Sequence, residues 1–138
     1  MSVNFDLRAG GWHYPQKPEA GYRLSLPAKA LIYGQKKLEY SGPLYNSAKV
    51  KGNKVIISFD HTGSGLMAKN DTLKGFVIAG KDNKWFVADA IINGNKIEVS
   101  NPSVEHPTQV RYAWGDRPVG NLYNKEGLPA SPFKAYVQ

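Results

Sequence analysis

Cysteine is absent from the 138 residues of this chain, so no disulfide can form and no thiolate can act as a nucleophile or metal ligand. The chain also lacks any apolar run close to the roughly 20 residues that a transmembrane helix needs. Its first residues show no hydrophobic signal-peptide core. We therefore expect no membrane partner, and the sequence leaves the localisation of the protein open.

Acidic residues are few, with 11 Asp and Glu against 18 Lys and Arg, which gives a formal net charge of +7. A positive balance of this kind can indicate binding to nucleic acid. Here, however, the lysines are scattered as single residues near turns, and only Lys36 and Lys37 are adjacent. No nucleic-acid-binding motif accompanies them, so we expect no nucleic-acid partner.

Metal-binding and cofactor-binding motifs are also missing. The three histidines, His13, His61 and His106, are far apart and have no His or acidic partner at metal-ligand spacing. No glycine-rich segment ends in the lysine and hydroxyl residue of a phosphate loop. We expect no metal and no cofactor. His61 is expected to cap backbone groups where a strand meets a turn, and His106 to lie in extended backbone because it precedes Pro107.

One serine has a superficial catalytic signature. Ser64 lies in TGSGL, which is similar to the G-x-S-x-G elbow of serine hydrolases. That elbow requires a strand before the serine and a helix after it, whereas the pattern here predicts strands on both sides. We therefore interpret Ser64 as a turn residue.

Residues 18–33 have the features of a helix. Pro18 suits the first turn and Gly34 can end the helix in the left-handed conformation. Leu24 and Leu31 are seven residues apart and define a candidate apolar face. Pro27 removes a backbone donor and is expected to kink or split the helix.

After Gly34 the apolar period changes to two, and turn signals such as Asn93-Gly94 separate the alternating segments. This pattern predicts a mainly β fold: an antiparallel β-sandwich, preceded by one α-helix and closed by a Pro-rich C-terminal strap. The strap is GLPASPF, residues 127–133. The residues expected to be buried by their strand phase are Phe59, Phe76, Ile78, Ile97, Val99, Tyr112 and Trp114.

Aromatic residues are plentiful, with three Trp, eight Tyr and five Phe. Exposed aromatic rings could form a platform for a sugar, although aromatic residues that alternate with polar ones more often fill a sheet core. An independent carbohydrate-binding or interaction module is therefore one functional hypothesis.

A second hypothesis comes from a family resemblance carried by several motifs in order. Together they resemble the C-terminal region of sialate O-acetylesterases, which are carbohydrate esterases of the SGNH hydrolase class. The segments are SGPLY (41–45), SFDHTGSGL (58–66), LKGFVIAG (73–80), VRYAW (110–114) and NLYNKEGLPASPF (121–133). Residues 23–44 also resemble the last catalytic-domain helix of that family and its crossing into the β-domain.

The resemblance implies a division of the chain and a partner. Residues 1–34 would be the end of a catalytic domain, and residues 35–138 an accessory β-sandwich domain. An upstream α/β catalytic domain would supply the serine nucleophile and the oxyanion hole. The substrate would be O-acetylated sialic acid or another carbohydrate, and the parent reaction would be hydrolysis of its O-acetyl esters. This chain alone is expected to be inactive, because it has no recognisable nucleophile.

The resemblance also implies one catalytic residue. The segment WHYPQK places His13 and Lys17 like the family's H-P-x-x-K motif, whose histidine is the general base. Two departures are visible, because Tyr14 replaces the motif's proline and Gly10-Gly11 stand where an acidic partner belongs. Asp6 is the nearest acid.

The strap also acquires two possible roles. Its prolines, Pro129 and Pro132, lower the entropy cost of an extended segment, and Leu128 and Phe133 are expected to be its anchors. It would either pin the chain end against a larger catalytic domain or cover one sheet of its own sandwich.

Overall fold

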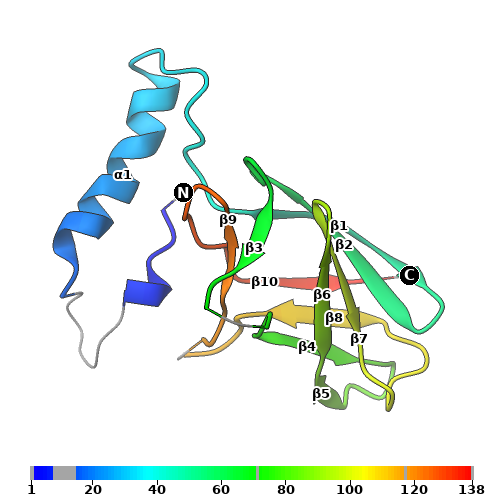
Figure 1. The fold of residues 1–138 in the computed structure, drawn as a ribbon. Coiled ribbons are helices and arrows are strands. Elements are labelled where there is room, and N and C mark those ends of the chain that lie inside the picture. The colour runs from blue at the N-terminus through cyan, green and yellow to red at the C-terminus, as the bar shows by residue number, and fades with distance from the viewer. Residues whose placement is uncertain (1, 8–14, 71, 117, 138) are drawn as a thin grey trace.

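The computed structural model describes residues 2–7, 15–70, 72–116 and 118–137, and within these ranges the fold is mainly β (Figure 1). A single α-helix precedes the strands, as the sequence predicts. In chain order the elements are η1 (Phe5–Leu7), α1 (Lys17–Leu31), β1 (Leu44–Lys51), β2 (Lys54–Asp60), β3 (Leu66–Ala68), β4 (Phe76–Ala79), β5 (Trp85–Val87), β6 (Asp89–Asn93), β7 (Lys96–Ser100), β8 (Gln109–Tyr112), β9 (Leu122–Asn124) and β10 (Phe133–Tyr136).

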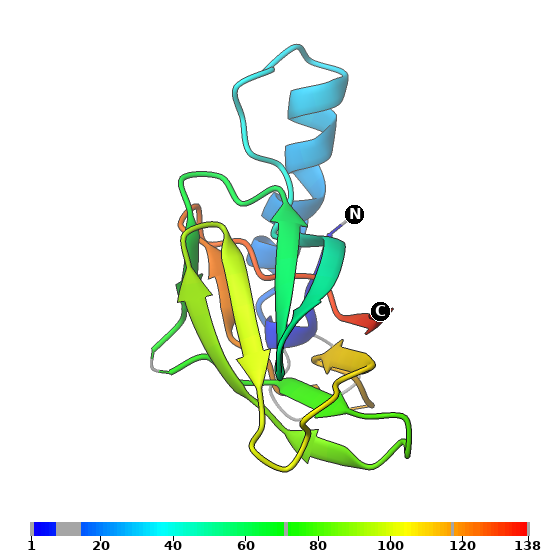
Figure 2. The ribbon, with the colours of Figure 1, turned by 90° about the vertical axis from the view of Figure 1, so that its right-hand side faces the viewer.

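The described strands form three antiparallel sheets. The first has the order β1-β2-β7-β6 and the second the order β10-β8-β4-β5, while β3 and β9 form a two-stranded ribbon. Figure 1 shows β8 and β10 running across β6 and β7, and Figure 2 shows α1 standing apart from the sheets at one end of the molecule. This crossing is the orthogonal form of sheet-on-sheet packing.

The core lies between the two four-stranded sheets, because alternate residues of each strand point into it. Val55, Ile57 and Val99 contribute from the first sheet, and Ile78 and Val110 from the second, all fully buried. All but one of the predicted core residues are buried. The buried ones are Phe59, Phe76, Ile78, Ile97, Val99 and Tyr112.

The exception is Trp114, which is 57% exposed, so its predicted burial is wrong. Strand β8 ends at Tyr112, and the next residue, Ala113, has a φ of +47°. A left-handed residue interrupts the alternation of side chains, and the ring of Trp114 therefore emerges on the surface instead of entering the core.

Helix α1 confirms the predicted helix to within two residues, but its details differ from the prediction. It continues through Pro27 without splitting. The buried face is formed by Arg23, Leu26 and Ala30, whereas Leu24 and Leu31 are 63% and 68% exposed. The predicted apolar face is therefore the outer one, because the contacts of Arg23 decide which side of the helix faces the protein.

The C-terminal strap packs on its own sandwich. Leu128 and Phe133 are buried, as expected, and β10 pairs antiparallel with β8 at the edge of the second sheet. The Ser131 amide donates a hydrogen bond of 3.0 Å to the carbonyl of Pro43. A side chain at Gly42 would collide with the carbonyl oxygen of Pro129, so glycine is what allows this close approach.

Candidate functional site

The predicted general base, His13, lies outside the described residues, as do Gly10, Gly11 and Tyr14. Its role therefore stays a prediction. Lys17, the other residue of this motif, is exposed and begins α1.

A buried ion pair connects the N-terminal segment, α1 and the sandwich. Arg23 donates to the two carboxylate oxygens of Asp6 at 2.7 and 2.9 Å, and the hydroxyl of Tyr123 on β9 donates to the same carboxylate at 2.8 Å. The Arg23 guanidinium also binds Glu19 at 2.8 Å and the carbonyl of Val3 at 2.9 Å. Only 6% of the Arg23 side chain and 9% of the Asp6 side chain are exposed.

The charges in this network depend on one another. Burial alone would raise the pKa of Asp6, but the hydrogen bonds from Arg23 and Tyr123, with the positive charge of Arg23, outweigh burial and lower that pKa below its ordinary value. Burial and the hydrogen bond to Asp6 raise the pKa of Tyr123 above its ordinary value. The Asp6 carboxylate is therefore an anchor that holds α1 on the sandwich, with both oxygens occupied.

A second histidine has an acidic partner that sequence spacing did not reveal. His61 Nδ1 lies 2.8 Å from Glu39 Oε1, and the His61 ring packs edge-on against Tyr40 with centroids 4.9 Å apart. Its backbone has a φ of +56°. A carboxylate that orients an imidazole is the geometry of a general base, and it replaces the backbone cap expected for His61. The pairing of His61 with Glu39 is visible only in the folded structure, since 22 residues separate the two partners in the sequence.

The serine next to this histidine–carboxylate pair is not activated by it. The hydroxyl of Ser41 donates to the carbonyl of Gly42 at 2.9 Å. Asn124, fully buried, donates to the carbonyls of Ser41 and His61 at 2.9 and 3.2 Å and accepts from the Leu128 amide at 2.9 Å. These contacts fix the backbone around His61 and tie it to the strap, which is a structural role.

Ser64 lies in a turn before β3, as predicted. Its hydroxyl and its amide both donate to the carboxylate of Glu126, whose pKa is lowered chiefly by the hydrogen bond from this hydroxyl. A hydroxyl that donates to a carboxylate in an exposed turn has neither the strand-to-helix geometry nor the histidine contact of a catalytic serine.

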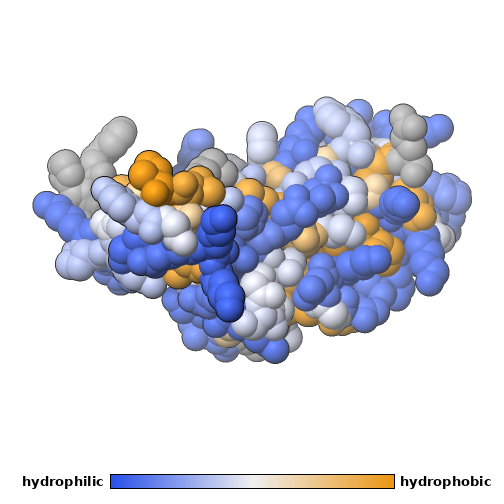
Figure 3. Space-filling view, turned by 90° about the horizontal axis from the view of Figure 1, so that it is seen from above, coloured by the Kyte–Doolittle hydropathy of each residue, from blue (hydrophilic) through white to orange (hydrophobic). Residues whose placement is uncertain are grey.

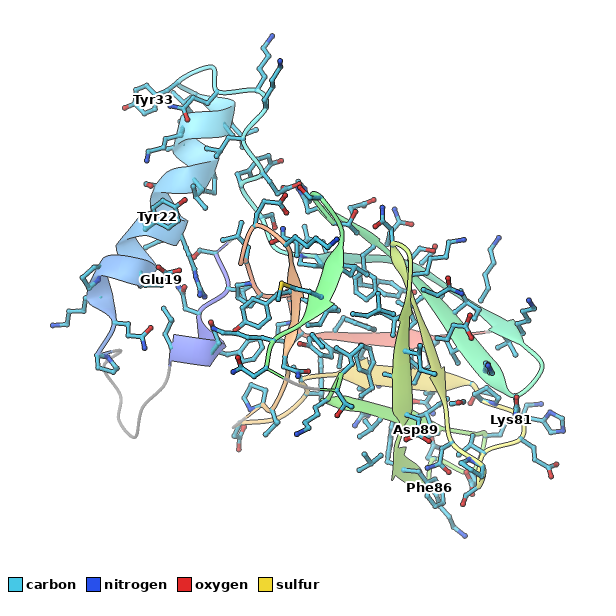
Figure 4. The ribbon with its side chains drawn as sticks, viewed as in Figure 1. Glu19, Tyr22, Tyr33, Lys81, Phe86 and Asp89 are labelled. Atoms are coloured by element: carbon cyan, nitrogen blue, oxygen red, sulfur yellow. The ribbon has the colours of Figure 1, made fainter. Side chains whose placement is uncertain are left out.

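The outer side of α1 and its C-terminal continuation form an exposed apolar surface. We call it the α1 surface, and its members are Leu24, Leu31 and Ile32, with exposed fractions of 63%, 68% and 76%. Tyr22 and Tyr33 are also exposed, at 52% and 76%, but Tyr22 lies about 160° around the helix from Leu24 and so belongs to another side of α1. Figure 3 shows a small group of hydrophobic atoms at this end of the molecule, surrounded by hydrophilic residues, and Figure 4 shows Tyr33 pointing away from the sandwich. Apolar side chains that are this exposed on one side of a helix are typical of a contact surface.

The other end of the protein carries a different surface, on the outer face of the second sheet. The guanidinium carbon of Arg111 lies 3.9 Å from the ring centroid of Trp85 and 5.9 Å from that of Trp114. Lys134 Nζ lies 4.6 Å from the ring centroid of Tyr136. The sequence suggested an aromatic platform in general terms, but did not identify which rings are exposed.

Within the part of the chain that the structure describes, no group of three or more His, Asp or Glu side chains could hold a metal ion. Over the same residues, no helix is long and apolar enough to cross a membrane.

With this geometry described, the chain can be compared with solved structures. A carbohydrate acetylesterase from Xanthomonas citri superposes with a TM-score of 0.87 at 36% sequence identity. The match covers 93% of this chain and 30% of that structure. No protein-family model matches the chain.

The chain is also similar to several sialate O-acetylesterases. Human sialate O-acetylesterase is 30% identical over 99% of this chain, and the enzymes of Pongo abelii and Mus musculus are 28% and 27% identical over the same share. The chain is thus a homologue of the sialate O-acetylesterases, as its motifs indicated. It spans 29% of the length of the human relative.

Proposed function

We propose that this chain is the C-terminal part of a sialate O-acetylesterase-like carbohydrate esterase: the last helix of the catalytic domain, within residues 1–34, and an accessory β-sandwich, residues 35–138. The parent reaction is hydrolysis of O-acetyl esters on sialic acid or another sugar. The proposal is supported by homology over 99% of this chain to relatives of which it spans only 29%.

The observation that carries the proposal is the α1 surface. If the chain were a self-sufficient binding module, its one described helix would bury its apolar side against the sandwich. Instead, the Arg23–Asp6 pair holds the opposite side on the sandwich and leaves Leu24, Leu31 and Ile32 in solvent. An upstream α/β catalytic domain is the partner that would cover this surface.

In the assembled enzyme, a serine of the upstream domain attacks the acetyl carbonyl while a histidine takes its proton, and an oxyanion hole stabilises the negative oxygen. This chain contributes His13 as that base. The C-terminal sandwich holds α1 in place through the contacts of Arg23 with Asp6 and of Asp6 with Tyr123.

The chain by itself should not hydrolyse acetyl esters above the buffer rate, because a histidine without a positioned nucleophile and oxyanion hole is only a weak catalyst. The test is a chimaera in which this chain replaces the matching segment of the Xanthomonas citri enzyme. We expect the chimaera to hydrolyse a chromogenic acetate, His13→Ala to abolish this rate, and His106→Ala, the matched control at an exposed histidine, to leave it unchanged.

The contact surface is tested separately. Leu31→Asp with Ile32→Asp should leave the melting temperature of the lone chain unchanged but abolish the activity of the chimaera. Ile91→Asp is the control, since Ile91 is 63% exposed on the first sheet. Turnover by the lone chain that disappears in Ser64→Ala would overturn the proposal and reveal an independent esterase.

A further inference from the structure

The second sheet turns a row of polar and aromatic side chains away from the core. Because Ile78, Val110 and Ala135 point into the core, their strand neighbours point outward. We call this row the outer aromatic face, and its members are Trp85, Gln109, Arg111, Lys134 and Tyr136, joined by Trp114 just beyond β8.

Two cations meet on this face without an anion. Arg111 and Lys134 are directly opposite each other in the β8–β10 register. Like charges in that position repel and destabilise the pair of strands. Among the described residues, no carboxylate forms an ion pair with either of them. The Nε atom of Arg111 is buried without a hydrogen-bond partner. A bound anion would relieve the repulsion between the two cations.

The rings beside these cations are suited to a sugar. Tyr136, at the end of β10, is 69% exposed, and Trp114, just beyond the end of β8, is 57% exposed. The apolar C–H faces of a pyranose can pack on such rings, while planar polar side chains bind its hydroxyls. Asn83, which is exposed, supplies such a group, and its Oδ1 accepts a hydrogen bond from the side-chain amide of Gln109, which is only 8% exposed.

We propose that the outer aromatic face binds a sugar that carries a carboxylate, such as a sialic acid. Trp114 and Trp85 pack against the ring, and Arg111 and Lys134 bind the carboxylate through charge-assisted hydrogen bonds. The choice of sialic acid among acidic sugars rests on the proposed function. The two cations match one carboxylate, whereas a single-stranded nucleic acid requires a basic groove that follows many phosphates.

The experiment is a titration of the 138-residue chain with the methyl α-glycoside of N-acetylneuraminic acid, followed by tryptophan fluorescence and by amide chemical shifts. The ligand carries no O-acetyl ester, so binding is measured without any hydrolysis and a failed esterase assay does not affect the result. We expect saturable binding at millimolar ligand, with shifts confined to β5, β8 and β10 and to the neighbouring residues Asn83 and Trp114. The methyl ester of the same sugar, which lacks the charge, should bind about tenfold more weakly.

Variants assign the binding to these residues. Arg111→Gln and, separately, Lys134→Gln should each weaken binding by about tenfold. Trp114→Ala should weaken it similarly without changing the melting temperature, because its ring is exposed. Tyr22→Ala is the matched control, since Tyr22 is an exposed aromatic residue with Lys29 stacked over it at 5.7 Å on α1, and it should bind like the parent chain.

Three results would overturn the inference. They are the absence of saturable binding, equal affinity for the sugar and its methyl ester, and full binding by folded Arg111→Gln and Lys134→Gln variants. Tighter, salt-dependent binding of a single-stranded oligonucleotide to the same residues would assign the face to nucleic acid instead.

Discussion

Replacing Arg23 by methionine removes the charged centre that holds α1 on the sandwich. The substitution keeps most of the side-chain volume but takes away the contacts to Asp6, Glu19 and Val3. Asp6 then remains as a carboxylate with a 9% exposed side chain and the Tyr123 hydroxyl as its remaining side-chain partner. A buried charge that loses its counter-charge is the costly outcome, not the loss of the ion pair as such.

Breaking a buried pair from one side typically costs about 3–5 kcal/mol. For a chain of this length, 1 kcal/mol corresponds to a change of about 4 °C in the melting temperature, so we expect a fall of about 12–20 °C. Removing both charges, in Asp6→Asn with Arg23→Met, should recover much of that loss because no unpaired charge remains.

The assay is thermal unfolding followed by far-UV circular dichroism, with amide hydrogen exchange to locate the change. Protection should fall first in α1, since this helix depends on the network, and later in the sandwich. Lys54→Met is the matched control. It breaks the Lys54–Glu98 pair, whose Lys54 side chain is 46% exposed, and it should leave the melting temperature nearly unchanged. An Arg23→Met variant that melts like Lys54→Met would refute the assigned role of the network.

Three further predictions test the fold. The pKa of Tyr123 is raised in the folded state, so the stability that its protonated hydroxyl contributes is complete below pH about 10 and is lost as the pH rises through the folded-state pKa. Tyr123→Phe lacks this hydroxyl, and its free energy of unfolding, measured by urea titration, should therefore fall less steeply at alkaline pH. Phe59→Ala should cost about 3–5 kcal/mol because its ring is buried, whereas Trp114→Ala should melt within a few degrees of the parent; equal losses in calorimetry would contradict the assigned exposure of these rings. Gly42→Ala should lower the melting temperature strongly because its new methyl group meets the strap, while Gly21→Ala, in an open helical position, should raise stability by about 1 kcal/mol; a harmless Gly42→Ala would show that the strap does not pack this closely.

The sequence predicted the strands well because alternation and turn residues are local signals that survive in the fold. The predicted burial of Trp114 was wrong because a single left-handed residue, Ala113, reverses the alternation of inward and outward side chains. Alanine rarely adopts this conformation, so the sequence does not predict it. It chose the wrong face of α1 because the helix is held by a charge, Arg23, and not by its leucines.

The candidate site shows the same limit of local reasoning. The partner of His61 is Glu39, 22 residues earlier, and no spacing rule connects them. Arg111 and Trp85 are brought together by the pairing of β8, β4 and β5, which depends on the whole sheet order. By contrast, the turn at Ser64 was predictable, because neighbouring glycines and flanking strands specify it locally.

The position of the strap and β10 in the sequence determines when the core can fold during synthesis of the chain. Phe133, the first residue of β10, stacks on Tyr45 with ring centroids 4.9 Å apart and also packs against Phe59, Phe76 and Tyr112. The aromatic centre of the core is therefore completed by a strand that the ribosome adds last among the strands described here. Until residues 133–136 have been synthesised, β8 offers an unpaired edge and the core lacks its central ring. A nascent chain halted at residue 132 would remain an unfolded substrate for chaperones and proteases, although it would already contain nine of the ten described strands.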